Sequence, residues 1–347
     1  MEDFPPVSAL AGSLNALNSQ ITQAGSQKPG SHPTSSSDAG ITPPNPDSID
    51  ELGISSAIVE QTVLKFLYFR GEMLGRELAG ALGLEFSLID ELIESLKRTH
   101  TIGVRKSLGM GNSSGIFFLT EAGRATAREH LENNQYVGPL PVPLYQYTEV
   151  VRRQRLKDNW LNPETLRKAF SHLVVEQDIL AKIGPAVNSN KSFLIYGQPG
   201  NGKTALAEAL FNVDTAPIFM PYAIESQGNI IQVYDPIYHQ KIDDDEPALL
   251  SLAANSGYDR RWFRCKRPFI VTGGELAMSM LDLSYNSVSK IYDAPFQVKA
   301  NNGIYLVDDF GRQKATPAEI LNRWIVPHGT PRRLLEFPER RQDDRTV

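Results

Sequence analysis

Residues 197–204 read GQPGNGKT, and this stretch limits what the chain can fold into more than any other. Its closely spaced glycines disfavour the interior of a helix or strand and favour a tight turn. The run before it, KSFLIY, is rich in β-formers, whereas the run after Thr204, ALAEALF, consists mostly of strong helix formers. The sequence therefore predicts a strand, a glycine turn and a helix that begins near Lys203.

The same residues fit the phosphate-binding pattern G-x-x-x-x-G-K-[ST] in the strand–turn–helix context that this pattern requires. Such a turn aims backbone N–H groups at phosphate oxygens, and the start of the helix adds the positive end of its dipole. Lys203 can reach the β- and γ-phosphates, and the Thr204 hydroxyl can ligate Mg²⁺. The expected nucleotide-binding residues are Gly197, Gln198, Pro199, Gly200, Asn201, Gly202, Lys203 and Thr204. The alternative, a glycine turn without a ligand, is disfavoured by this context.

A second motif, GIYLVDDFGRQ at residues 303–313, supplies acidic groups of the kind that such a loop needs. Residues 304–307 are apolar or aromatic and predict a buried strand that ends at Asp308 and Asp309. Asp308 would hold Mg²⁺ through water, and Asp309 would orient and deprotonate an attacking water. KRPFIVTGGELA, at residues 266–277, predicts an intervening strand. The alternative is an ordinary strand-to-turn Asp-Asp pair without a metal.

Together these motifs resemble the AAA+ family of P-loop ATPases over residues 160–327. The G-x-P-G-x-G-K-T form of the loop is typical of that family, and so is the lead-in from NPETLRKAF to KSFLIYG. Within the lead-in, Val174 and Val175 resemble the strip that contacts adenine. One position departs from the family, which usually has Glu where Asp309 stands, so water activation would start from a side chain one methylene shorter.

The resemblance implies an α/β fold with a three-layer αβα core, with ATP and Mg²⁺ as cofactors. Thr204 and Asp308 would then be the metal-binding residues and Asp309 the catalytic residue. The family couples ATP hydrolysis to the remodelling of a macromolecular client, in a ring that is usually a hexamer. Two other functions remain open: a non-hydrolysing ATP-binding adaptor, and a nucleotide-switched DNA-binding regulator.

The residues after the second motif change character abruptly. A module of this family needs a further strand that senses the γ-phosphate, an arginine offered to the neighbouring subunit and a helical lid. TPAEILNRWIVP predicts one helix, but residues 328–347 show no pattern of a strand or an amphipathic helix. We therefore expect a C-terminally incomplete core followed by an atypical tail. We weigh an authentic tail against a shifted reading frame near residue 327, and favour the second.

The N-terminal part predicts a separate domain. Residues 1–47 are rich in Ser, Pro and Gly and lack the apolar content that ordering requires, so we expect disorder there. Residues 48–135 then resemble a winged helix-turn-helix domain in the order of their elements. The expected elements are helices in residues 55–71, 76–84 and 86–98, strands in 101–107 and 115–120, and a helix in 121–133 capped by Thr120. Residues 136–159 read as a proline-rich linker followed by a helix.

Winged helix domains often bind DNA through their third helix. Here that helix carries acidic residues that phosphate would repel, namely Asp90, Glu91 and Glu94. Cations near the hairpin could still contact a phosphate backbone: Lys97, Arg98, Arg105 and Lys106. We favour a protein-docking or oligomer-contact role for this domain over DNA recognition.

The composition indicates a cytoplasmic protein. Lys and Arg number 35 against 40 Asp and Glu, and the resulting net charge of −5 gives no general attraction to nucleic acid or anionic lipid. No apolar run approaches the ~20 residues that a membrane span needs, so we expect no membrane insertion. The chain begins MEDF without a secretory pattern, and the single cysteine, Cys265, cannot form an internal disulfide.

Overall fold

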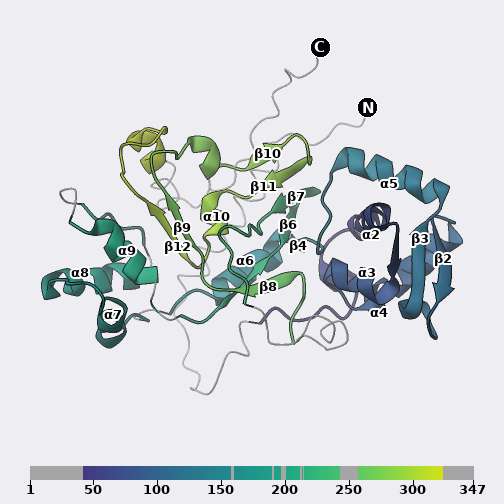
Figure 1. Cartoon of the computed structure of the whole chain (residues 1–347), viewed down its shortest axis with the longest axis horizontal. Coiled ribbons are helices and arrows are strands. Elements are labelled where there is room, and N and C mark those ends of the chain that lie inside the picture. Colours follow the sequence, from purple (N-terminus) through teal and green to yellow (C-terminus); the bar gives the residue numbers. More distant parts are fainter. Residues whose placement is uncertain are drawn as a thin grey trace, which may run out of the picture.

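The computed structural model describes residues 42–157, 160–189, 191–196, 201–211, 213, 215–242 and 257–322. Expectations for the first 41 residues, for loop residues 197–200 and for the tail beyond residue 322 lie outside this part of the chain. The described residues form a mixed α/β protein in which helices and several sheets succeed one another (Figure 1). Helices α2–α5 lie at one end, α7–α9 lie at the other, and a five-stranded sheet lies between them.

The N-terminal unit contains the elements that the sequence predicts, in the predicted order. They are α2 (Ser56–Arg70), α3 (Gly75–Leu82), α4 (Phe86–Arg98), β2 (Ile102–Ser107), β3 (Gly115–Leu119) and α5 (Glu121–Asn133). The predicted cap of α5 is confirmed, because the Thr120 side chain accepts a hydrogen bond from the Gly123 N–H at 3.1 Å. The residues of α4 at apolar helical spacing are Leu88, Ile89, Leu92, Ile93 and Leu96; Ile89, Ile93 and Leu96 are buried, and Leu88 and Leu92 are half-buried.

The sequence does not predict strand β1 (Glu72–Leu74). It is only three residues long and pairs with β3, so that the sheet has the antiparallel order β1-β3-β2. A strand this short has no readable periodicity. Its existence depends on a partner more than forty positions later in the chain, and local pattern reading cannot detect such a partner.

Residues 42–47, within the segment expected to be disordered, are described without regular secondary structure. Pro43 is buried, and its carbonyl accepts a hydrogen bond from the Asp259 N–H at 3.1 Å. The expectation of disorder is therefore wrong for the end of this segment. The contact partner lies far along the chain, and a proline can be buried against it without regular backbone pairing.

The segment after α5 is not the free linker that its prolines suggested. Leu140 is fully buried in the N-terminal core, and its N–H donates to the Leu82 carbonyl at 2.8 Å. Strand β4 (Val142–Pro143) then pairs with the next unit, and α6 (Leu144–Arg153) follows directly. The prolines are compatible with this arrangement because β4 is the last strand at one edge of its sheet.

The central unit is rich in strands that the sequence did not predict. Its five-stranded mixed sheet has the order β10-β11-β7-β6-β4, and a separate antiparallel pair joins β5 to β8. These strands are β5 (Ile218–Pro221), β6 (Ala223–Ser226), β7 (Asn229–Gln232), β8 (Trp262–Cys265), β10 (Ser284–Asn286) and β11 (Ile291–Asp293). Their inward side chains form the core of the unit, which includes Met220, Ile224 and Trp262.

The third unit combines helices with a parallel strand pair. Its main elements are α7 (Pro163–Ala169), α8 (Gln177–Asn188), α9 (Lys203–Phe211), β9 (Phe269–Thr272) and β12 (Ile304–Val307). Both strands were expected from the sequence, and the structure pairs β12 with β9 in parallel register. Helix α9 begins at Lys203, which confirms the predicted start.

Two local expectations in this unit differ from the structure. Residues 191–196 were expected to form a strand, but they have no regular secondary structure, and Leu194 and Tyr196 are 68 % and 88 % exposed. β12 is only half-buried instead of buried. Among the described residues, residues 191–196 pair with no strand, whereas β12 pairs with β9 along one edge and leaves its other edge without a strand neighbour, which accounts for its partial burial.

Candidate functional site

A hydrogen bond joins the two sequence motifs. The Thr204 hydroxyl at the start of α9 donates to Asp308 Oδ2, just beyond the end of β12, at 2.9 Å. These residues lie 104 positions apart in the chain. The structure therefore brings together the two residues that the sequence nominated as metal ligands.

The packing of α9 against the strand pair explains this contact. Leu206 and Leu210 of α9 share a hydrophobic cluster with Ile304, the first residue of β12. At the other end of α9, Phe211 stacks on Phe269, the first residue of β9, with ring centroids 4.9 Å apart. The helix therefore runs antiparallel to both strands, which places its N-terminus at their carboxyl ends.

The backbone changes direction sharply after β12. The Asp308 N–H still continues the parallel ladder by donating to the Thr272 carbonyl at 2.8 Å. The next residue, Asp309, has a φ of 49°, in the left-handed region that Asp tolerates better than most residues. Its N–H donates to Asp308 Oδ1 at 2.9 Å, so Asp308 uses one oxygen for the turn and the other for Thr204.

The Asp309 side chain differs from that of Asp308 in its surroundings. The residue is exposed, and its carboxylate has no hydrogen-bonding partner among the described residues. An exposed carboxylate at a strand end can accept a proton from a nearby water without first breaking an ion pair. It is also less firmly oriented than the carboxylate of Asp308.

The turn after the aspartates is held by a residue that sequence reasoning missed. The Gln313 amide donates to the carbonyls of Asp308 and Asp309 at 2.7 and 3.1 Å. Its side-chain oxygen accepts a hydrogen bond from the Gly311 N–H at 2.7 Å. The only signal in the sequence was the FGRQ stretch itself, and no spacing rule assigns its glutamine a role.

The strand pair also carries a hydroxyl contact close to the site. Thr272 Oγ1 and the Tyr305 hydroxyl lie 3.1 Å apart, from neighbouring strands. Burial raises the pKa of Tyr305 to about 12, so the phenol stays protonated at neutral pH. On the loop after β9, hydrogen bonds from backbone N–H groups, that of Gly273 first, hold the pKa of Glu275 below its usual value.

Only the second half of the glycine-rich loop belongs to the described residues. Gly202 has a φ of 69°, a conformation that strains residues with a side chain, and its carbonyl accepts the Leu206 N–H at 2.9 Å. Lys203 and Thr204 are half-buried in the first turn of α9, and Asn201 is exposed. Gly197, Gln198, Pro199 and Gly200 lie outside the described part.

The two valines nominated for adenine contact separate in the structure. Val175 packs against the cluster that contains Leu206 of α9, whereas Val174 is fully exposed. Val175 is therefore linked by packing to the element that carries Thr204. Val174 makes no such contact with the core.

The donor set at Thr204 and Asp308 suits a hard cation such as Mg²⁺. Both donors are oxygens, and Mg²⁺ in nucleotide sites uses one or two carboxylates together with water and substrate phosphates. The described residues contain no cluster of three or more His, Cys, Asp or Glu that could hold a metal without a substrate. The chemistry therefore fits a metal that is shared with a phosphate ligand.

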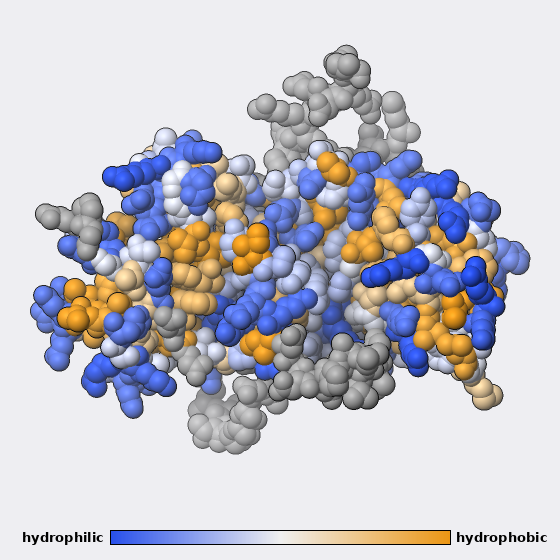
Figure 2. All heavy atoms as spheres, viewed as in Figure 1, coloured by the Kyte–Doolittle hydropathy of each residue, from blue (hydrophilic) through white to orange (hydrophobic). Residues whose placement is uncertain are grey.

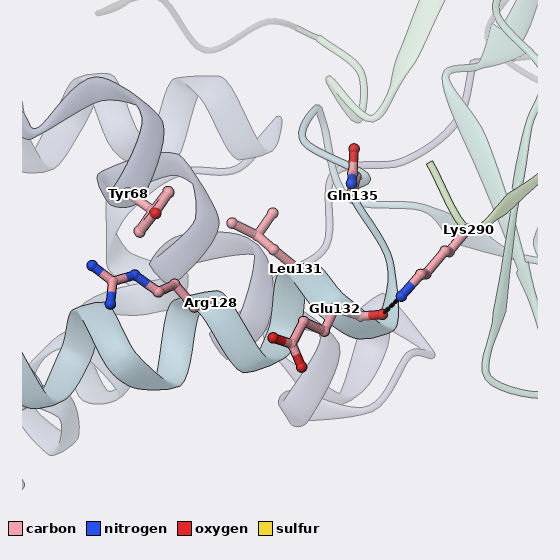
Figure 3. A pocket seen from close by; sticks show the side chains of 6 residues that line it. All are labelled: Tyr68, Arg128, Leu131, Glu132, Gln135 and Lys290. Carbon is pink, nitrogen blue, oxygen red and sulfur yellow. Dashed lines mark hydrogen bonds between the residues drawn. The ribbon is translucent and has the colours of Figure 1, made fainter. Parts of the chain in front are cut away.

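A pocket of about 330 Å³ lies elsewhere, between α5 and the turn that follows β10 (Figure 3). It is lined by Tyr68, Arg128, Leu131, Glu132, Gln135 and Lys290. The Lys290 ammonium donates to the Glu132 carbonyl, which joins two residues that line the pocket. Figure 1 places α5 and α9 at opposite ends of the molecule, so this pocket is separate from the Thr204–Asp308 site.

The surface near α8 and α9 carries apolar side chains. Figure 2 shows apolar atoms gathered over this end of the molecule. The exposed apolar residues of this unit include Ile179, Phe193, Leu194, Tyr196 and Phe211.

None of the described helices combines the length and the apolar character that a bilayer span requires.

Comparison with protein-family models and with curated proteins gave no significant match. The functional assignment of this chain therefore depends on its own residues and their geometry.

Proposed function

We propose that this chain binds ATP and Mg²⁺ at the start of α9 and the end of β12, as an AAA+-type ATPase. The observation that carries the proposal is the 2.9 Å hydrogen bond between Thr204 and Asp308. A glycine-rich loop and a strand-end aspartate are each common by themselves. Their meeting across 104 positions, with the correct residue of each motif in contact, is not expected of two unrelated turns.

Each residue of the proposed site has a distinct chemical task. The Lys203 ammonium compensates phosphate charge, and the N–H groups at the start of α9 add donors to the phosphate oxygens. Thr204 and Asp308 would hold Mg²⁺, which when bound neutralises charge on the β- and γ-phosphates. Asp309 takes a proton from the attacking water. Val175 lies in the same packed unit and is the better placed of the two valines for adenine contact.

The arrangement of elements supports the finer fold assignment. A helix that runs antiparallel to a parallel strand pair, with its N-terminus at the carboxyl ends of the strands, is the arrangement in which α/β folds bind phosphate. The order of helices and strands at residues 48–135 likewise supports a winged helix-like domain. By resemblance, such a protein works as a ring, usually a hexamer, and uses hydrolysis to remodel a macromolecular client.

A second function is favoured by one observation. Asp309 is exposed, adopts a left-handed φ and stands where the family usually has the longer Glu. Poor orientation of the water-activating group would leave binding intact while slowing hydrolysis. A non-hydrolysing ATP-binding adaptor is therefore the alternative.

Calorimetric titration of the purified chain with ATP and Mg²⁺ tests the binding proposal. We expect Lys203→Ala to lose about 1.5–3 kcal/mol of binding free energy, because a charge-assisted contact to phosphate disappears. Lys182→Ala is the matched control, since Lys182 is an exposed lysine on α8 of the same unit. Equal ATP affinity for wild type and Lys203→Ala would exclude the proposed site.

A further inference from the structure

The Gln313 side chain makes three hydrogen bonds to the turn that carries the two aspartates. Its amide nitrogen donates to two successive carbonyls, those of Asp308 and Asp309, and its oxygen accepts from Gly311. One side chain therefore uses both its donor and its acceptor to hold a stretch of backbone only six residues long. The Gln313 side chain therefore stabilises the conformation of this turn.

The conformation of this turn is unusual and needs support. Asp309 has a φ of 49° and Gly311 a φ of 103°, so two of four consecutive residues lie in the region that favours glycine. An L-residue with a side chain is held in this region only where its surroundings stabilise it. The Gln313 donors supply such stabilisation, because they bond the carbonyls on both sides of the Asp309 φ/ψ pair.

The far side of the turn is fixed separately. The Lys314 N–H donates to the Gly274 carbonyl at 3.2 Å, and the Ala315 N–H donates to the Leu276 carbonyl at 3.1 Å. Asp308 is fixed at the near side by its bond to Thr272. The near end of the turn is therefore anchored to the last residue of β9, and the far end to the loop after β9. Between these ends, Gln313 makes three of the hydrogen bonds of the turn, and two more join the Arg312 N–H to the Asp309 carbonyl at 3.0 Å and the Asp309 N–H to Asp308 Oδ1 at 2.9 Å.

We propose that Gln313 is a positioning residue for the metal site, because it keeps Asp308 in contact with Thr204. This inference rests on the proposed function. Asp308 Oδ1 accepts the Asp309 N–H while its Oδ2 accepts from Thr204, so the orientation of the carboxylate follows the orientation of the next peptide. Gln313 fixes that peptide through the carbonyl of Asp308. Without Gln313 the carboxylate is held less firmly, and Mg²⁺ strengthens ATP binding less.

The test measures how much Mg²⁺ improves ATP affinity. Calorimetry of the full chain is run with ATP in EDTA and with ATP in excess Mg²⁺, for wild type, Gln313→Ala and Gln313→Glu. The Glu variant keeps the size and the acceptor for Gly311 but loses both donors. Gln177→Ala, which removes an exposed glutamine from α8 of the same unit, is the matched control.

We expect wild type and Gln177→Ala to gain affinity from Mg²⁺. Both Gln313 variants keep the wild-type ATP affinity in EDTA. They lose about tenfold or more of the gain in ATP affinity that Mg²⁺ gives, as is typical when a residue that supports a metal ligand is substituted. Asp308→Asn loses the same gain, and adding Gln313→Ala to it causes no further loss, because both changes act through one carboxylate. If Gln313 had a purely structural role, its substitution would also lower the ATP affinity measured in EDTA.

The outcomes separate the two claims. If wild type gains affinity from Mg²⁺ and both Gln313 variants gain equally, the role of Gln313 is refuted and the nucleotide site stands. If both variants show a lower ATP affinity in EDTA and also a lower melting temperature, Gln313 has a structural role and is not a positioning residue. If wild type binds no ATP under either condition, the proposed function itself fails, and the inference fails with it.

Discussion

The Arg261 guanidinium donates to the Leu52 carbonyl at 3.0 Å and so joins two units of the protein. Leu52 belongs to the core of the N-terminal unit, whereas Arg261 immediately precedes β8 of the central unit. Arg261 is only 1 % exposed and forms a buried ion pair with Asp259 at 2.8 Å. The Gln146 side chain accepts a further hydrogen bond from it. A fully buried cation therefore holds the junction between these units.

Removing this cation is expected to destabilise the protein strongly. Arg261→Ala leaves the Asp259 carboxylate buried without its partner, and breaking a buried pair in this way costs roughly 3–5 kcal/mol. Arg152→Ala breaks an exposed pair with Glu149 and should cost less than about 1 kcal/mol. Urea unfolding of both variants measures the difference. Similar unfolding midpoints would mean that the junction contributes little to stability.

Lys65 is expected to make stability depend on pH. The side chain is 1 % exposed on α2, and burial lowers its pKa from 10.5 to about 8. An unfolded chain then binds more protons than the folded one between pH 8 and 10.5, so the free energy of unfolding rises with pH across this window. Below pH 8 the buried charge destabilises the protein by its full amount.

Lys65→Met tests this expectation. The variant should be more stable than wild type at pH 7 by roughly 1–3 kcal/mol, and the difference should shrink as the pH rises towards 10.5. Asn134 Oδ1 loses the Lys65 donor but keeps a hydrogen bond from the Tyr136 N–H at 3.2 Å, so it is not left unsatisfied. Denaturant unfolding of both proteins from pH 7 to 10 gives the comparison. A difference that does not vary with pH would contradict the role of the Lys65 charge.

The N-terminal unit is not expected to recognise DNA. Asn112 of the hairpin turn donates to Asp90 at 2.8 Å and to Glu94 at 2.6 Å, so these acids help to hold the turn against α4. Two of the cations that phosphate could use are already paired, Lys97 with Glu94 at 2.8 Å and Arg105 with Glu72 at 3.1 Å. We therefore predict no sequence-selective binding to duplex DNA at physiological salt.

Gel-shift or anisotropy measurements across a salt series check this prediction. Non-specific attraction to phosphate would appear only at low salt and fall steeply as salt rises. A sequence-selective shift at nanomolar protein would show that the acidic side chains of α4 do not prevent DNA binding.

The sequence predicted the elements whose signals are local. The buried face of α4 follows from the spacing of Ile89, Ile93 and Leu96, and the start of α9 follows from the glycines that precede Lys203. The contact between Thr204 and Asp308 was implicit in two motifs that each have a fixed local form. Most residues of the candidate site could therefore be predicted from short motifs with fixed spacing.

The remaining structure depends on partners far away in the chain. Val142 pairs with Ile224 and Tyr292 pairs with Ile231, in strands of two to four residues that have too few positions for a readable alternation. Gln313 could not be recognised because its contacts depend on the φ of Asp309, which no residue pattern specifies. For residues 193–196 the sequence predicted a strand that the structure lacks, because β-forming side chains do not make a strand without a neighbouring strand.

The rate of ATP turnover separates the proposed ATPase from the adaptor, and Asp309 is the proposed catalytic residue. We expect slow phosphate release from this chain, because the Asp309 carboxylate is exposed, is unpaired among the described residues and is one methylene shorter than the Glu usual in AAA+ proteins. A general base contributes typically 10²–10⁴ in rate, so Asp309→Asn should reduce even this slow release to background while leaving ATP affinity unchanged. Asp178→Asn, an exposed aspartate in the first turn of α8, is the control that should change neither quantity.

Asp309→Glu completes the test, because its side chain is one methylene longer and brings the carboxylate closer to the attacking water. If a short side chain limits water activation, the longer carboxylate should raise phosphate release above that of wild type at the same ATP affinity. Steady-state phosphate release of the four proteins, together with their ATP affinities by calorimetry, gives the answer. Turnover that persists in Asp309→Asn would show that another group activates the water. Absence of turnover in every variant, with ATP–Mg²⁺ binding intact, would favour the adaptor.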